Sequence, residues 1–227
     1  MNDSAPSQLP QDIEDGLTIL HTNPVVSDKS EHTELIFNAL KPKEQWKIFP
    51  YCMDETCYLD IETTGLSSTT DSITTVVVHS SSGTYTFING YNLDLLPEVV
   101  NKFKCMVTYN GKQFDIPFIE NKLNTKISVP HLDLRYILLS TLNMKGGLKS
   151  CEIQLEMPPR EIEEVDGCIA PSLWADYKNN GNTASLRKLL AYNFEDSVRL
   201  EWIMKEIFNR VTPHHYHHPS FPNNPFT

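Results

Sequence analysis

Carboxylate side chains that could hold a metal ion occur in three places along the chain, and the first pair lies in an apolar segment. Asp60 and Glu62 alternate there with Leu59 and Ile61. Because successive side chains of a β-strand point to opposite faces, a strand would place both carboxylates on one face. The turn at Gly65 is typical of the strand ends at which α/β sheets present ligand-binding groups. A solvated strand face explains the same pattern, so this motif alone leaves both readings open.

A third carboxylate, Asp115, follows Asn110 and Gly111 and precedes Pro117. This order predicts a strand end, a glycine turn and the start of a helix. Aspartate is favoured at a helix start by capping and by the helix dipole. Taken alone, Asp115 is therefore explained more readily as a helix cap than as a metal ligand.

Tyr192 and the fourth carboxylate, Asp196, lie four residues apart in a segment with helical spacing of its apolar residues, for which we expect a long helix over Leu186–Phe208. Residues four apart share one face of a helix, with Cβ atoms about 6 Å apart, so this pair can share a site. The alternative is an amphipathic helix with both side chains at the margin of its apolar stripe. Glu195 projects to one side of Asp196 and is expected to be exposed.

Four carboxylates gathered in one pocket would repel one another, which raises the pKa of at least one of them unless cations neutralise the charge. Ligand sets made only of oxygen favour hard ions such as Mg²⁺ or Mn²⁺ over Zn²⁺. Two such ions, roughly 4 Å apart, can stabilise both the attacking and the departing oxygen in phosphodiester hydrolysis. The predicted cofactor is therefore a pair of divalent metal ions.

The segments around these residues predict an α/β fold, a mixed sheet covered by helices on both faces. Three β-branched or aromatic runs, separated by turn residues, predict consecutive strands, and strand-helix alternation follows them. The five expected strands are Thr56–Glu62, Ser72–His79, Gly83–Asn89, Cys105–Tyr109 and a short strand around His131–Leu134. Helices are expected over Leu93–Phe103, over Phe114–Leu123 and in several segments up to Arg210.

Composition predicts one folded domain between two polar tails. Of the 227 residues 40% are hydrophobic, which is enough to build one α/β core. Residues 1–30 are polar with scattered prolines and predict a poorly ordered arm, and residues 212–227 predict a disordered tail, so the domain spans 31–211. The histidines of the tail, between His214 and His218, lack the fixed geometry of a functional metal site.

Charge and cysteine content limit the classes of protein. A net charge of -10 argues against a broad basic surface for long duplex nucleic acid. The five cysteines are odd in number and spread out, no signal peptide is visible, and no apolar run approaches the ~20 residues of a membrane span. We therefore expect a soluble protein of the cytoplasm. Cys52 and Cys57 have the spacing of half a zinc site, but no second pair follows.

Together and in this order, the three motifs resemble the DEDD exonuclease superfamily. The first motif is the D-x-E that begins at Asp60, the second is an N-x3-F-D that ends at Asp115, and the third is a Y-x3-D from Tyr192 to Asp196. The tyrosine matches the branch of the superfamily named after it, DEDDy. The histidine branch would place a histidine where this chain has Ala191.

Beyond the motifs, the chain is most similar to YprB-type ribonuclease-H-like domains, and the resemblance covers about Glu34 to Arg210. The segment Glu156–Arg160 differs from the Leu-Gly-Ile-x-Arg that those domains show. The shared segments are Glu44–Pro50, His131–Leu134, Gly146–Lys149, Ala170–Trp174 and Tyr192–Asp196.

The resemblance implies a ribonuclease-H-like mixed five-stranded sheet and a two-metal-ion exonuclease. Such an enzyme takes the 3′ end of single-stranded DNA or RNA and releases nucleoside monophosphates. It implies that Asp60 bridges the two ions and that Glu62 and Asp196 hold the ion that activates water. Asp115 would act on the other ion through water. Tyr192, whose ordinary pKa near 10 makes it a poor base at neutral pH, would orient the attacking water.

Four further residues are assigned to substrate binding, namely Thr63, Leu66, Asn110 and Phe114. Leu66 and Phe114 could pack near a terminal base, although such residues more often belong to a core. Asp133 is a fifth acidic residue at a strand end, and the resemblance implies no catalytic role for it. We expect Asp133 to form structural hydrogen bonds and to cap the following helix.

Two other functions are compatible with these residues. One is a structure-selective endonuclease, which uses the same two-metal chemistry on branched substrates. The other is a catalytically silent nucleic-acid-binding module on the same fold, because a fold alone does not establish activity. A complete set of mutually repelling carboxylates disfavours the silent module.

Overall fold

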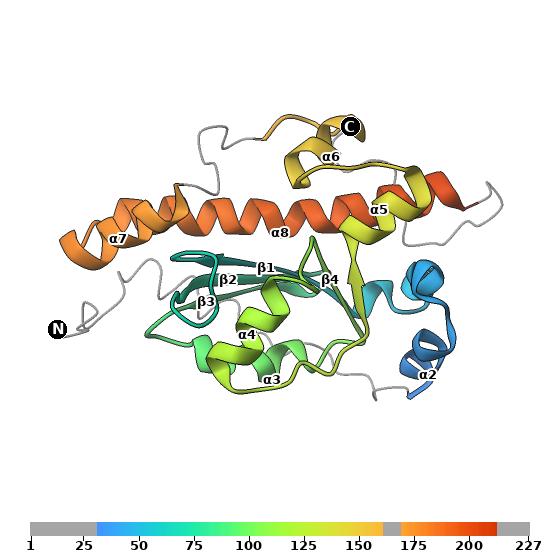
Figure 1. Cartoon of the computed structure of the whole chain (residues 1–227), viewed down its shortest axis with the longest axis horizontal. Helices are drawn as coiled ribbons and strands as arrows, with labels where there is room; N and C mark the ends of the chain where they lie inside the picture. The colour runs from blue at the N-terminus through green and yellow to red at the C-terminus, as the bar shows by residue number, and fades with distance from the viewer. Residues whose placement is uncertain (1–30, 161–168, 213–227) are drawn as a thin grey trace.

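The computed structural model of the chain describes residues 31–160 and 169–212 (Figure 1). The N-terminal arm, Cys168 and the histidine-rich part of the tail lie outside these described residues. Within them, no helix is both long enough and apolar enough to cross a membrane.

The centre of the molecule is a mixed five-stranded sheet with the strand order β3-β2-β1-β4-β5. The first three strands of the chain pair antiparallel, whereas β4 lies parallel to β1 and β5 lies parallel to β4. All five expected strands are confirmed, with small shifts at their ends. Their bounds are β1 Thr56–Thr63, β2 Ile73–Ser80, β3 Gly83–Ile88, β4 Cys105–Thr108 and β5 His131–Asp133.

Helices cover both faces of this sheet, as expected. The long helix α8 crosses one face, and α3 and α4 lie on the other (Figure 1). The α-helices are α2 Glu31–Ala39, α3 Leu96–Val100, α4 Asp115–Leu123, α5 Leu134–Leu142, α6 Leu148–Gln154, α7 Ala170–Asn180 and α8 Thr183–Val211. The 3-10 helices are η1 Pro42–Tyr51, η2 Met53–Glu55 and η3 Leu93–Leu95.

Two expected helices have different bounds in the structure. The single helix expected over Leu93–Phe103 is wrong, because η3 and the short α3 share that segment and the chain then turns. The backbone N–H of Phe103 bonds to the carbonyl of Val100 in this turn, which buries the Phe103 ring. Helix α8 begins before its apolar spacing does, because the Asn182 side chain accepts from the backbone N–H of Ala184 at 3.1 Å and caps it.

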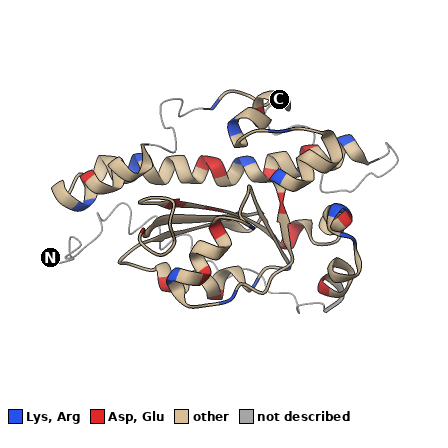
Figure 2. Ribbon diagram, in the orientation of Figure 1, with Lys and Arg blue, Asp and Glu red and all other residues tan. Residues whose placement is uncertain are grey.

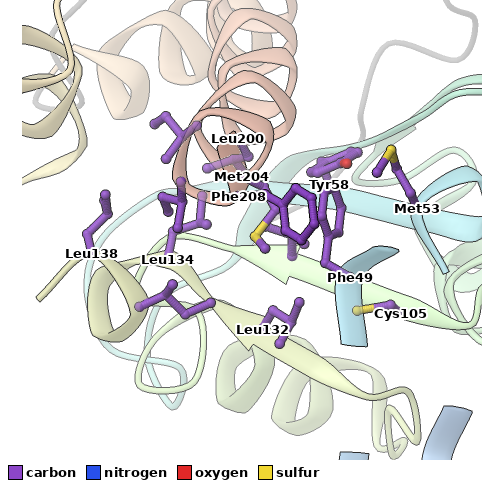
Figure 3. Packing of buried hydrophobic residues seen from close by; sticks show 14 of the residues in the cluster. Phe49, Met53, Tyr58, Cys105, Leu132, Leu134, Leu138, Leu200, Met204 and Phe208 are labelled. Atoms are coloured by element: carbon purple, nitrogen blue, oxygen red, sulfur yellow. The ribbon is translucent and has the colours of Figure 1, made fainter. Parts of the chain in front are cut away.

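The alternation along β1 separates two apolar clusters. Leu59 and Ile61 pack with the core beneath the sheet that contains α3 and α4. Tyr58, on the opposite face, packs with α5, η1 and the end of α8 that includes Phe208 (Figure 3). Tyr58 and the following even-numbered residues of β1 therefore point to the face of the sheet that α8 covers.

Candidate active site

Strand β1 places Asp60 and Glu62 on the face covered by α8, which confirms the expected alternation with Leu59 and Ile61. Glu62 is buried and Asp60 is partly buried. The register with β2 shifts just after Glu62, at Thr63. The two carboxylates therefore stand at the end of the regular ladder, in the centre of the sheet.

Helix α8 adds the third carboxylate of the cluster. Carboxylate oxygens of Asp60, Glu62 and Asp196 all lie within 4.8 Å of one another. Asp196 is buried, and Tyr192 is buried one helical turn before it. Tyr192 and Asp196 thus share a buried face of α8, as expected, and Asp196 meets the carboxylates of β1 on that face.

Asp115 reaches the site through the turn between β4 and α4. Gly111 allows this turn, since a Cβ there would lie 2.2 Å from Thr108 Oγ1. The residue that caps α4 is Phe114, and α4 has no side-chain capping bond, so Asp115 does not serve as the helix cap. Asp115 lies outside the group of three, but its charge raises the pKa of both Asp60 and Glu62.

Burial raises the pKa of every carboxyl group here, and for Asp60 and Glu62 the charges of the other carboxylates add to it. Burial raises the pKa of Asp60 well above its usual range, and the charges of Asp196 and Glu62 add to this. The pKa of Glu62 rises to about 8 through burial and the charges of Asp196 and Asp115. Burial raises the pKa of Asp115 to about 7. At neutral pH these groups therefore retain protons unless cations offset their charge.

The same surroundings also raise the pKa of Tyr192, but for a phenol this means that it stays a hydrogen-bond donor. Burial raises the pKa of its phenol, and the charges of Asp196 and Glu62 raise it further. The phenol therefore keeps its proton at neutral pH. A protonated phenol donates a hydrogen bond and cannot act as a general base.

Asn193 holds Asp60 in position, and the sequence analysis did not single it out. Its Nδ2 donates to Asp60 Oδ2 at 2.7 Å and to the Asp60 carbonyl at 3.1 Å. The hydroxyl of Thr75 on β2 donates to Asn193 Oδ1 at 3.1 Å. Asn193 is fully buried, so these bonds satisfy its amide and join α8 to two strands.

A buried ion-pair network borders the same cluster. Arg160 donates to Asp196 and also to Glu152 of α6, and Glu152 lies 3.5 Å from Arg199. Arg199 in turn pairs with Glu195 at 2.9 Å, and the Glu195 side chain is only 14% exposed. The expected exposure of Glu195 is therefore wrong, because its carboxylate is paired with Arg199, which also lies against Glu152 of α6.

The structure separates the four residues assigned to substrate binding. Leu66 is 86% exposed, whereas the Thr63 hydroxyl is buried and donates to the Gly65 carbonyl at 2.7 Å. Asn110 adopts a left-handed backbone conformation, and its Oδ1 accepts from Arg135. Phe114 packs against the core, with its ring centroid 5.5 Å from that of Phe118. Their assignment to substrate binding stays a prediction.

Asp133 has the structural role that its position predicts. Its carboxylate accepts from the backbone N–H of Arg135 and caps α5. It also accepts from the backbone N–H groups of Asn110 and Lys112 at 2.8 and 3.0 Å. Asp133 thus fixes the turn that leads to Asp115.

The donor set suits hard divalent cations. Asp60, Glu62 and Asp196 offer oxygen ligands only, and their raised pKa values indicate a need for positive charge. Among the described residues this is the one group of three or more ligands close enough to hold an ion. Cys52 and Cys57, at half-zinc-site spacing, are buried free thiols that do not belong to such a group.

The fold places this carboxylate cluster, which could hold a metal ion, in a ribonuclease-H-like domain. The RNase_H_2 model of the RNase_H superfamily matches residues 57–208, a range that contains β1 from its second residue, the other four strands and all four carboxylates. The chain belongs to this superfamily. A comparison with curated proteins gave no significant match.

Solved structures with a similar fold include a family B DNA polymerase from the hyperthermophilic archaeon Pyrobaculum calidifontis, with a TM-score of 0.51 and 13% identity. The similarity covers 68% of this chain and 24% of the polymerase chain, so this chain spans about a quarter of that protein. Brucella melitensis NrnC is 14% identical, with a TM-score of 0.38 and coverage of 75% and 94%. NrnC with bound Mg²⁺ is 15% identical, with a TM-score of 0.37 and coverage of 72% and 91%.

Proposed function

We propose that this protein is a metal-dependent 3′-to-5′ exonuclease of the DEDDy type. It would hydrolyse phosphodiester bonds of single-stranded DNA or RNA and release nucleoside monophosphates. One observation carries the proposal: oxygens of Asp60, Glu62 and Asp196 gather within 4.8 Å, and Tyr192 lies buried one helical turn before Asp196. Membership of the ribonuclease H superfamily supports it.

Asp60, Glu62 and Asp196, with Asp115 beside them, would hold two divalent ions, Mg²⁺ or Mn²⁺. When bound, such ions stabilise the attacking and departing oxygens of a phosphodiester. To bind these ions, the carboxylates would lose the protons that burial retains on them at neutral pH. Asn193 fixes the orientation of Asp60 for this purpose through its bond to Oδ2.

Tyr192 would direct the attacking water. Its phenol keeps its proton, so it can donate a hydrogen bond while a backbone on a rigid helix fixes its direction. The burial of Tyr192 and Asp196 limits access of bulk solvent to this side of the site. Helix α8 would thus both orient the attacking water and keep bulk solvent away from it.

Leu66 would contact a base of the substrate, a role that its exposed position three residues after the end of β1 supports. We place the activity in the cytoplasm, a reducing compartment in which the four described cysteines would stay free. The acidic net charge suits an enzyme that takes a short single-stranded end and does not grip a long duplex.

The test uses 5′-labelled single-stranded DNA and RNA with purified protein and its Asp60→Ala variant, in Mg²⁺, Mn²⁺ or EDTA. We expect a ladder that shortens from the 3′ end, requires metal and is lost in the variant. A single internal cut on a branched substrate would favour the endonuclease. Binding without cleavage under every condition would favour the silent module, and the exonuclease proposal would then be wrong.

A further inference from the structure

Arg160 is a cation inside the acidic site to which the mechanism above assigns no task. Its side chain is 8% exposed. Nε and Nη2 donate to the two carboxylate oxygens of Glu152 at 3.0 and 2.5 Å. Nη1 donates to Asp196 Oδ1, and the guanidinium carbon lies 5.9 Å from the centroid of the Tyr192 ring. One edge of the guanidinium is therefore held by α6, and its remaining nitrogen faces the carboxylate cluster.

The backbone that leads into Arg160 is restricted on its N-terminal side. Pro158 and Pro159 precede it and restrict the backbone torsions of the segment. The carbonyl of Pro158 accepts from Arg199 Nη1 at 3.1 Å, and the same nitrogen lies 3.5 Å from Glu152. Arg160 thus reaches the site in a fixed position, which reduces the entropy that binding a ligand would cost.

A structural ion pair explains only part of this arrangement. A buried guanidinium needs a hydrogen-bonded counter-charge, and the bidentate pair with Glu152 supplies it. The contact with Asp196 goes beyond that need. It places a permanent positive charge next to a carboxylate of the cluster and beside the phenol of Tyr192.

We infer that Arg160 binds the phosphate of the substrate, so that Nη1 donates to an oxygen of the phosphodiester at the carboxylate cluster. The inference rests on the proposed function and specifies the ligand as the anionic backbone of a single-stranded nucleic acid. Guanidinium suits this ligand because it keeps its charge at every physiological pH and presents several fixed donors to phosphate oxygens. Glu152 is then the positioning residue, because it holds two of the three nitrogens.

The experiment measures binding of 5′-fluorescein-labelled single-stranded DNA and RNA by fluorescence anisotropy, over a series of KCl concentrations. Ca²⁺ replaces Mg²⁺, and a gel of the same samples verifies that the oligonucleotide stays intact. For Arg160→Gln we expect affinity to fall about tenfold, because a charge-assisted bond to phosphate is lost. The slope of log affinity against log salt should also fall by about 0.7, the contribution of one phosphate contact on a single strand.

Two variants sharpen the result. Arg160→Lys keeps the positive charge but loses the planar set of donors of the guanidinium. It should therefore preserve the slope of log affinity against log salt and weaken binding about threefold. Arg210→Gln is the matched control, because Arg210 also lies against a carboxylate, Glu206, but at the far end of α8. It should leave both affinity and slope unchanged. If Arg160→Gln does not fold, the Lys variant carries the test, and unchanged nucleic-acid affinity in that variant overturns the inference.

A titration with Mn²⁺ in the absence of nucleic acid separates phosphate binding from a merely structural role. Removal of a positive charge beside Asp196 should leave Mn²⁺ affinity unchanged or stronger. If Arg160→Gln weakens Mn²⁺ binding and leaves the salt slope intact, Arg160 only positions Asp196 and the inference is wrong. If the parent protein binds no nucleic acid at all, the proposed function fails too. If the unchanged protein cleaves the substrate but Arg160→Gln keeps its slope of log affinity against log salt, only this inference is overturned.

Discussion

Tyr192 and the carboxylates beside it share one environment but differ in what a raised pKa does to them. The pKa of Glu62 rises to about 8, so this group must lose a proton before it can bind a cation at neutral pH. The pKa of Tyr192 also rises, and the phenol thereby remains a hydrogen-bond donor. Burial thus favours the protonated form of both: in the carboxylates a bound cation would have to displace the proton, whereas the protonated tyrosine cannot act as a base.

Replacement of single residues should separate these tasks. We predict that Tyr192→Phe slows turnover about a hundredfold, because water loses its orienting donor, and that it changes metal affinity little. Asp60→Ala should remove both activity and metal binding. Turnover is measured on labelled oligonucleotide and metal affinity by calorimetric titration with Mn²⁺. Tyr85→Phe, a change at a buried tyrosine of β3 on the other core, is the control, and near-normal turnover in Asp60→Ala would contradict the mechanism.

At the level of elements, the site depends on the crossing of α8 over β1. Asp60 and Glu62 come from the strand, and Asp196 and Tyr192 come from the helix. The link between these elements at the crossing is Asn193, whose amide bonds both the side chain and the backbone of Asp60. Charged residues of both signs also lie along α8 outside the crossing (Figure 2). The ion pairs Lys205–Glu201 and Arg210–Glu206 among them are partly exposed and contribute little to stability.

Removal of the Asn193 amide should therefore affect stability and activity together. We predict that Asn193→Ala lowers the free energy of unfolding by about 2 kcal/mol, because buried groups of Asp60 and Thr75 lose their partner. Activity should fall as well, since Asp60 is released. Urea unfolding provides the measurement. Asn180→Ala, at an exposed asparagine that bonds Asp176, should change stability by less than about 0.5 kcal/mol. Equal decreases in the free energy of unfolding for the two variants would contradict the role of Asn193 at the crossing of α8 and β1.

At the level of the whole molecule, the raised pKa values of the acidic cluster couple folding to pH, and a metal bound there would change this coupling. Carboxyl groups whose pKa is higher in the folded than in the unfolded chain retain protons on folding. For Glu62 the window runs from its ordinary 4.5 to about 8, and Asp115 reaches about 7. Because the folded state binds more protons in this window, the free energy of unfolding falls as pH rises through it.

We predict that in EDTA the melting temperature falls between about pH 5 and pH 8 through this linkage. Mn²⁺ should restore it, and the increase should be larger at the higher pH, because protons no longer compete with the ion at the carboxylates. Thermal unfolding with and without Mn²⁺ measures both effects. Glu62→Gln, which cannot release a proton, should flatten the dependence in EDTA. A melting temperature that rises with pH in EDTA would contradict the linkage.

The sequence by itself determined the features that depend on local order. The strands followed from apolar alternation, and the common face of Asp60 and Glu62 followed from the two-residue period of a strand. The same-face placement of Tyr192 and Asp196 followed from the helical turn. The order of the three motifs, by its resemblance to the DEDD exonucleases, indicated the fold before any contact between them was known. Asp133 was recognised as a cap because capping is local.

Only the tertiary structure decided which groups complete the site. Asn193 and Arg160 are polar residues with no periodic signal of their own, and their partners Asp60 and Asp196 are distant in sequence. The same reason explains the error at Glu195, because its partner Arg199 is held against Glu152 of α6, and no pattern within α8 reveals that contact. Local sequence places a side chain on a face of its element. What that face meets is decided by packing between elements, and therefore by the whole fold.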